Sequence, residues 1–190
     1  MILDAAASLL AEGGVPAVQV RAVAARVGMT DAGVTHHFGS RDNLLQELLR
    51  YGGRRLRTAV EQVLRSWIED GTDLLRLVTA LDALYREGYA ELAVALHAAG
   101  WRDRGAGMLD PLVEALHERR PDRDEVDVDD TRLAVAALHQ AIATEPLYGS
   151  AFRRSAGLTG RSATDSTAQL RWWASQLASA LGLPRPDRPG

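Results

Sequence analysis

The sequence contains no cysteine and no lysine, only 5% aromatic residues, and no apolar run long enough to span a bilayer. The absence of cysteine excludes disulfides, thiolate metal sites and thiol nucleophiles. The N-terminus also lacks a basic segment followed by an apolar stretch and a cleavage site, which argues against a secretory signal. We therefore expect a cytoplasmic protein with no membrane partner.

The charge is unevenly distributed along the 190 residues. All 22 basic residues are Arg, against 25 acidic residues, so the formal net charge is −3. Residues 1–57 nevertheless hold seven Arg and five acidic residues, and the rest of the chain is net negative. If one part of the chain binds nucleic acid, the charge pattern favours the N-terminal part.

Apolar residues recur at helical spacing through most of the chain, and no segment reads as a strand. The sequence predicts an all-α protein of about nine helices. Thr30 is expected to cap a short helix, and Pro146 to bend a long one. Ser162 with Asp165 has the spacing of a capping box for the last helix. Gly52-Gly53 interrupts a helical pattern, which indicates either a helix end or a soft joint.

Residues 20–38 have the layout of a helix-turn-helix: two short helical patterns separated by Gly28-Met29-Thr30. Glycine suits the open backbone that a tight turn needs. Val34 and Phe38 can be buried together, which leaves Thr30 to His37 exposed along one side of the second helix. A helix exposed in this way can enter the major groove of DNA.

Residues 2–49 resemble the DNA-binding domain of the TetR family of regulators. The resemblance rests on four blocks: Ile2-Leu3-Asp4-Ala5-Ala6, Val20-Arg21-Ala22-Val23-Ala24, Val27-Gly28-Met29-Thr30, and the run from His36 to Leu45. It implies that Thr30 caps the recognition helix and touches phosphate, and that Arg21 and Arg41 contact the DNA backbone. The residues that it places at base edges or phosphates are Asp31, Ala32, Gly33, Thr35, His36 and His37.

The resemblance further implies a three-helix DNA-binding domain at residues 1–47 and a bundle at residues 48–190 for ligand binding and dimerisation. The implied function is a dimeric repressor that binds a near-palindromic operator in double-stranded DNA and is released by a small, largely apolar effector. Side chains suited to the effector cavity are Trp67, Tyr85, Tyr89, His97, Trp101, Met108 and His139. Those suited to the dimer interface are Leu133, Ala137, Leu138, Ala141, Leu170, Trp173, Leu177 and Leu181.

Two alternatives stay open. The TetR family usually has Tyr in place of Thr35 and often Lys in place of Asp31, so the chain could be a sensor or interaction module with little DNA affinity. A small helical enzyme using His97, His139 and Glu145 is the other alternative, but no catalytic motif supports it. We therefore expect no enzyme activity, no metal and no cofactor.

Overall fold

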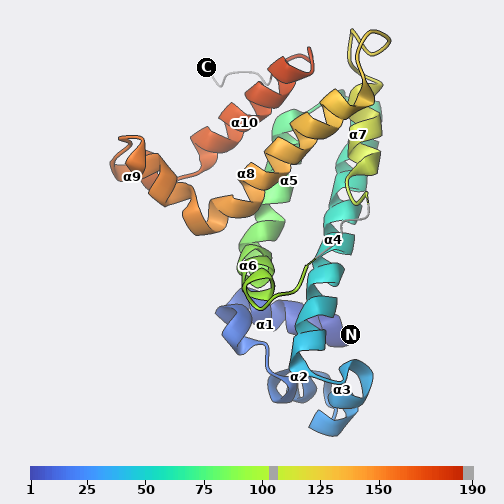
Figure 1. The fold of residues 1–190 in the computed structure, drawn as a ribbon, viewed down its shortest axis with the longest axis vertical. Coiled ribbons are helices and arrows are strands. Elements are labelled where there is room, and N and C mark those ends of the chain that lie inside the picture. The colour runs from blue at the N-terminus through green and yellow to red at the C-terminus, as the bar shows by residue number, and fades with distance from the viewer. Residues whose placement is uncertain (103–106, 186–190) are drawn as a thin grey trace. The chain divides into compact units, whose positions relative to one another are not determined.

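The computed structural model describes residues 1–102 and 107–185, and within them the only regular secondary structure is helical (Figure 1). The all-α prediction is confirmed. The helices are α1 (Ile2–Ala17), α2 (Val20–Val27), α3 (Asp31–Phe38), α4 (Arg41–Asp70), α5 (Leu74–Leu84), α6 (Ala90–Ala98), α7 (Asp110–His117), α8 (Val128–Ser155), α9 (Gly160–Thr164) and α10 (Thr167–Ala180), with a π-helical turn, η1 (Tyr85–Tyr89), between α5 and α6. None of these helices has the length and apolar character needed to cross a membrane.

The chain packs as two compact units. Unit 1 comprises Met1–Leu56 and Leu84–Ala106, and unit 2 comprises Arg57–Ala83 and Gly107–Gly190. The division falls inside α4 and at the last residue of α5. Packing therefore groups the chain differently from the predicted functional boundary between residues 47 and 48, which stays a prediction.

Unit 1 is built around small and β-branched residues. Ala6 of α1, Val23 of α2 and Val34 of α3 are fully buried, as is Leu48 of α4. Small side chains let short helices approach closely, and each buried aliphatic side chain contributes about 1.5–3 kcal/mol. This core fixes α2 and α3 against α1 and the start of α4.

The π-helical turn η1 belongs to unit 1 and packs against α1. Gly88 within η1 has φ +93°, a conformation that glycine adopts readily. A Cβ at Gly88 would lie 2.8 Å from the Cγ of Leu10 and 3.0 Å from the carbonyl oxygen of the same residue. The missing side chain thus allows η1 to touch α1. The sequence predicted a break at Gly88, but not the π-helical turn.

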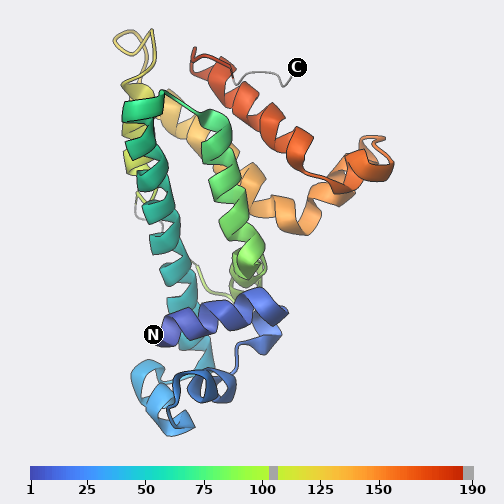
Figure 2. The same ribbon diagram turned by 180° about the vertical axis from the view of Figure 1, so that it is seen from behind.

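Unit 2 places α7 and α10 against α8, and α9 follows the end of α8. Leu112 and Leu116 of α7 and Ile142 of α8 are fully buried. Pro146 lies inside α8, and α8 changes direction between its two ends (Figures 1 and 2). A proline removes one backbone donor and displaces the preceding turn, so this bend was expected.

One local prediction was wrong. Ser162 lies inside α9, and Asp165 does not complete a capping box with it; its carboxylate instead accepts the Thr167 N–H at 2.9 Å, at the start of α10. Of the two alternatives at Gly52-Gly53, the structure excludes the helix end, because α4 continues through both residues. The soft joint stays a prediction.

Candidate nucleic-acid interface

The turn between α2 and α3 has the geometry that its sequence predicted. Gly28 ends α2 in the left-handed conformation, with φ 67° and ψ 30°. Two residues later the Thr30 hydroxyl accepts the backbone N–H of Gly33 at 3.1 Å. This cap satisfies one of the donors left unpaired at a helix start and stabilises a helix by about 1 kcal/mol. The short α3 helix therefore begins at a defined residue and with a fixed direction.

Only one residue of α3, Val34, is buried. Phe38 is half-buried at the end of the helix, so α3 is anchored at Val34 and Phe38 and presents its other side to solvent. Of the predicted DNA contacts on α3, only Gly33 is half-buried. The others are exposed: Asp31, Ala32, Thr35, His36 and His37. Arg21 on α2 and Thr30 at the N-terminus of α3 are exposed as well.

Arg41 has an intrachain role that the sequence did not reveal. Its Nε donates to the carbonyl oxygen of Val18 and one terminal nitrogen donates to that of Val15, both at 2.8 Å. These bonds tie the first residue of α4 to the segment between α1 and α2. A guanidinium has five N–H donors, so the two bonds are compatible with the predicted phosphate contact but do not test it.

Further contacts fix the frame around α3. Arg26 of α2 makes two 2.8 Å hydrogen bonds to the Glu12 carboxylate of α1. This pair lowers the pKa of Glu12. At the next corner, the Ser40 hydroxyl accepts the Asn43 N–H at 3.1 Å and so caps α4. The Arg26–Glu12 pair and the Ser40 cap are both exposed to solvent. They therefore orient the helices more than they contribute to the free energy of unfolding.

Sequence reasoning missed a polar hollow of about 400 Å³ beside the end of α3. Arg50 in its wall forms an ion pair with Glu47, and its guanidinium lies 5.9 Å from the centre of the Trp101 ring. The signal that could have found it is the i, i+4 spacing of polar residues on α4. The lining residues are His37, Phe38, Asn43, Gln46, Glu47 and Arg50.

The residues predicted to line an effector cavity are divided between the two units. Tyr85, Tyr89, His97 and Trp101 belong to unit 1, and Trp67, Met108 and His139 to unit 2. Burial raises the pKa of Tyr85 to about 12, Tyr89 is 2% exposed, and His97 is exposed. Trp101, Met108 and His139 are half-buried.

The indole N–H of Trp67 in unit 2 is a buried hydrogen-bond donor without an acceptor among the described residues. The whole Trp67 side chain is buried. The guanidinium of Arg119 lies 5.3 Å from the ring centre. A buried donor left unpaired costs about 1–3 kcal/mol, so this N–H is suited to an acceptor supplied by a ligand or water.

The predicted dimer-interface residues fall into two groups. Leu138, Leu170, Leu177 and Leu181 are buried within unit 2, while Leu133 and Ala137 are exposed and Ala141 and Trp173 half-buried. The sequence did not single out Trp172, which is 55% exposed. Helical periodicity gives the apolar faces of α8 and α10, but not which part of each face packs inside the chain.

The comparisons with known proteins agree with this geometry. Residues 2–48 match the family model described as bacterial regulatory proteins, tetR family. The fold resembles that of the fatty acid degradation regulator FadR from Bacillus halodurans, with 19% identity over 96% of this chain and 98% of that chain and a TM-score of 0.56. A second solved structure, the regulatory protein SCO4313, has 20% identity over 94% of this chain and 93% of that chain and a TM-score of 0.50. A search of curated proteins finds no match.

The two structural neighbours support the fold, and the family match supports the identity of the N-terminal helices. The match covers the segment whose second short helix is exposed, capped by Thr30 and preceded by a left-handed glycine. Residues 2–48 thus match the model of the tetR family of bacterial regulatory proteins, and the two solved structures support the same fold for the chain.

Proposed function

We propose that this chain is a transcriptional regulator of the tetR family that acts in the cytoplasm as a dimeric repressor on a near-palindromic operator. The observation that carries the proposal is that α3 buries only Val34 and leaves its predicted DNA contacts in solvent. Two copies related by a two-fold axis would place two α3 helices in successive major grooves, about 34–36 Å apart. The functional division would then lie near residue 47.

The dimer is supported by an apolar face on unit 2. Leu133 of α8 is 69% exposed. Beside it, a groove of about 290 Å³ runs between α8 and α10. Exposed apolar patches of this kind commonly mark interfaces. Apart from Leu138, the residues of α8 that line the groove are small, Ala134, Ala137 and Ala141, which would allow a second helix to approach closely.

Release by an effector is supported by the buried indole N–H of Trp67 in unit 2, which has no hydrogen-bond partner among the described residues. Small-molecule sites are mostly apolar, with a few polar groups that fix orientation. FadR from Bacillus halodurans, one of the structural neighbours, is a regulator of fatty acid degradation, so fatty acids are the first effector probes to test. A coupling of about 1–3 kcal/mol between effector and DNA would change operator affinity 5- to 150-fold.

Selection from a random duplex library tests the DNA-binding part of the proposal. We expect an enriched near-palindrome, and binding that weakens as salt rises because most of the affinity comes from phosphate contacts. Arg21→Gln should weaken binding to all sequences alike. If no sequence is enriched, the sensor or interaction module with little DNA affinity becomes the better account, consistent with the exposed carboxylate of Asp31 on the recognition helix.

Light scattering tests the dimer. We expect twice the chain mass for the wild type and a shift toward monomer for Leu133→Asp. Val94→Asp is the matched control, because Val94 is an exposed apolar residue on α6 in the other unit. A strictly monomeric wild type would contradict the dimer and, with it, the predicted spacing of the two half-sites.

A further inference from the structure

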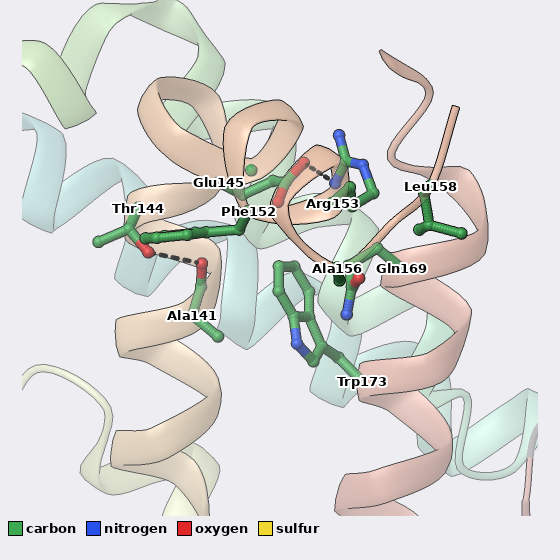
Figure 3. A pocket seen from close by; sticks show the side chains of 10 residues that line it. Ala141, Thr144, Glu145, Phe152, Arg153, Ala156, Leu158, Gln169 and Trp173 are labelled. Carbon is green, nitrogen blue, oxygen red and sulfur yellow. Dashed lines mark hydrogen bonds and ion pairs between the residues drawn. The ribbon is translucent and has the colours of Figure 1, made fainter. Parts of the chain in front are cut away.

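A pocket of about 330 Å³ lies within unit 2, apart from the residues predicted to line the effector cavity (Figure 3). Its walls come from the second half of α8, from the segment that follows α8, and from α10. A volume of this size is at the lower end of small-molecule sites. The lining residues are Ala141, Thr144, Glu145, Gly149, Phe152, Arg153, Ala156, Leu158, Gln169 and Trp173.

One part of the pocket wall is a buried ion pair. The Glu145 and Arg153 side chains are only 3% and 6% exposed, and Arg153 donates to a Glu145 oxygen at 2.6 Å. The Arg153 Nε also donates to the carbonyl oxygen of Ala163 in α9 at 3.0 Å. The guanidinium is therefore held between α8 and α9. Replacing a buried ion pair with apolar residues is often neutral or stabilising, so stability alone gives little reason for this one.

Glycine at position 149 determines where the carboxylate lies. A Cβ on Gly149 would overlap the carboxylate of Glu145, so that carboxylate rests directly over the glycine, which itself lines the pocket. A carboxylate has about four lone-pair sites. It can accept a ligand N–H or O–H in addition to the bond from Arg153.

The rest of the wall is apolar or aromatic. Figure 3 shows the indole of Trp173 on α10 below the ion pair, and the ring of Phe152 on α8 turned toward Thr144. Aromatic side chains hold a flat ring by offset or edge-to-face contacts. The aromatic part of a ligand would therefore lie against these rings, and its polar part toward the ion pair.

We infer that this pocket binds a small aromatic compound with one N–H or O–H donor, such as an indole or a phenol. The ring would contact Trp173 and Phe152, and the donor would hydrogen-bond to the Glu145 carboxylate. This inference does not depend on DNA binding or on the effector cavity. The pocket does share Ala141 and Trp173 with the groove that supports the proposed dimer.

Calorimetric titration of the full chain with indole and with 1-methylindole tests it. The two probes have nearly the same shape, but only indole has a donor. Indole should bind at least tenfold more tightly, because a hydrogen bond to a charged acceptor is lost in the methylated probe. Ala156→Phe should remove indole binding by filling the mouth of the pocket. Ala136→Phe is the matched control: it places the same side chain at an exposed position of α8 outside the pocket.

Three results would overturn the inference. Equal affinity for the two probes would show that Glu145 accepts no ligand donor. Unchanged indole binding by Ala156→Phe would place the bound molecule elsewhere. No indole binding, together with an altered oligomeric state in Ala156→Phe, would show that a second copy of the chain fills the pocket. The comparison of the two probes uses the wild-type protein and so does not depend on how any variant folds.

Discussion

The ring of Tyr89 occupies the space that a side chain on Gly52 would need. Tyr89 belongs to η1 and Gly52 to the first half of α4, and both lie in unit 1 with the DNA-binding helices. Arg55, one turn further along α4, forms an ion pair with Glu87 of η1. The glycine therefore serves close packing inside a continuous helix, and α4 is joined at this point to a segment distant in sequence.

Gly52→Ala should destabilise unit 1 by about 1–3 kcal/mol, because the added methyl group overlaps the Tyr89 ring and forces a shift. Gly53→Ala is the matched control in the next position of the same helix. Alanine is favoured over glycine in a helix by about 1 kcal/mol, and residue 53 is only half-buried, so this variant should be at least as stable as the wild type. Urea denaturation measures both. Equal stability of the two variants would contradict the packing role of Gly52.

Gly88→Ala should cost more stability than Gly28→Ala. Both glycines have positive φ, at +93° and +67°, so alanine adds about 1–2 kcal/mol of backbone strain at each. A Cβ at Gly28 meets nothing within 4 Å, whereas one at Gly88 meets Leu10. Thermal unfolding of the two variants separates steric overlap from backbone strain. A larger loss for Gly28→Ala would be inconsistent with close contact between η1 and α1.

The helix-turn-helix geometry was predictable because its signals are local. Gly28 at the turn and Thr30 at the cap act within a few residues, and both have the conformation expected of them. Burial of Val34 follows from helical periodicity over one short helix. The family resemblance then placed the exposed residues of α3 at DNA, and the family match over residues 2–48 is consistent with that assignment.

Features that depend on tertiary packing were not predictable. Leu138 and Leu177 have the spacing of interface residues, yet they are buried within unit 2, because periodicity marks an apolar face without saying what covers it. The Glu145–Arg153 pair was also missed. Its signal is the spacing of Glu145, Gly149 and Arg153, which puts a carboxylate, a small residue and a guanidinium on one side of α8.

The Glu145–Arg153 pair gives a prediction of its own. Arg153→Met should destabilise the protein by about 3–5 kcal/mol, because it removes the guanidinium that donates to the buried Glu145 carboxylate. The double variant Glu145→Leu, Arg153→Met should recover most of that loss, since neither charge is then buried alone. Chemical denaturation of both variants measures the difference. If the double variant is no more stable than the single one, the bond from Arg153 to the Ala163 carbonyl matters more than the charge pair.

His139 should make stability depend on pH in the mildly acidic range. Burial lowers the pKa of its imidazole below the ordinary value of 6.5. The unfolded chain therefore binds this proton more readily than the folded chain. The contribution of His139 is fully present above about pH 6.5 and is lost progressively as the pH falls below that value.

His139→Gln should flatten the loss of stability between about pH 7 and pH 5, and His97→Gln, which changes an exposed histidine, should leave it unchanged. Lowered pKa values of Asp4, Asp122 and Asp165 act in a separate window, below about pH 4, where these carboxylates take up protons. Thermal unfolding across this range distinguishes the two windows. A profile for His139→Gln that matches the wild type would assign the pH dependence to other groups.

Asp31→Asn tests how the recognition helix meets DNA. Asp31 is exposed in the first turn of α3, where its charge favours the helix N-terminus by about 0.3–1 kcal/mol but would repel nearby phosphate. If phosphate repulsion dominates, Asn at this position should tighten binding to all duplexes and steepen the salt dependence, since one fewer negative charge opposes the contact. If Asp31 instead accepts a hydrogen bond from a cytosine amino group, the variant should lose affinity only for duplexes with that base at the matching position.

Asp42→Asn, which changes an exposed carboxylate in the first turn of α4, controls for the general effect of removing one charge. Identical affinity and base preference in Asp31→Asn and the wild type would exclude both roles and place the first turn of α3 away from the DNA.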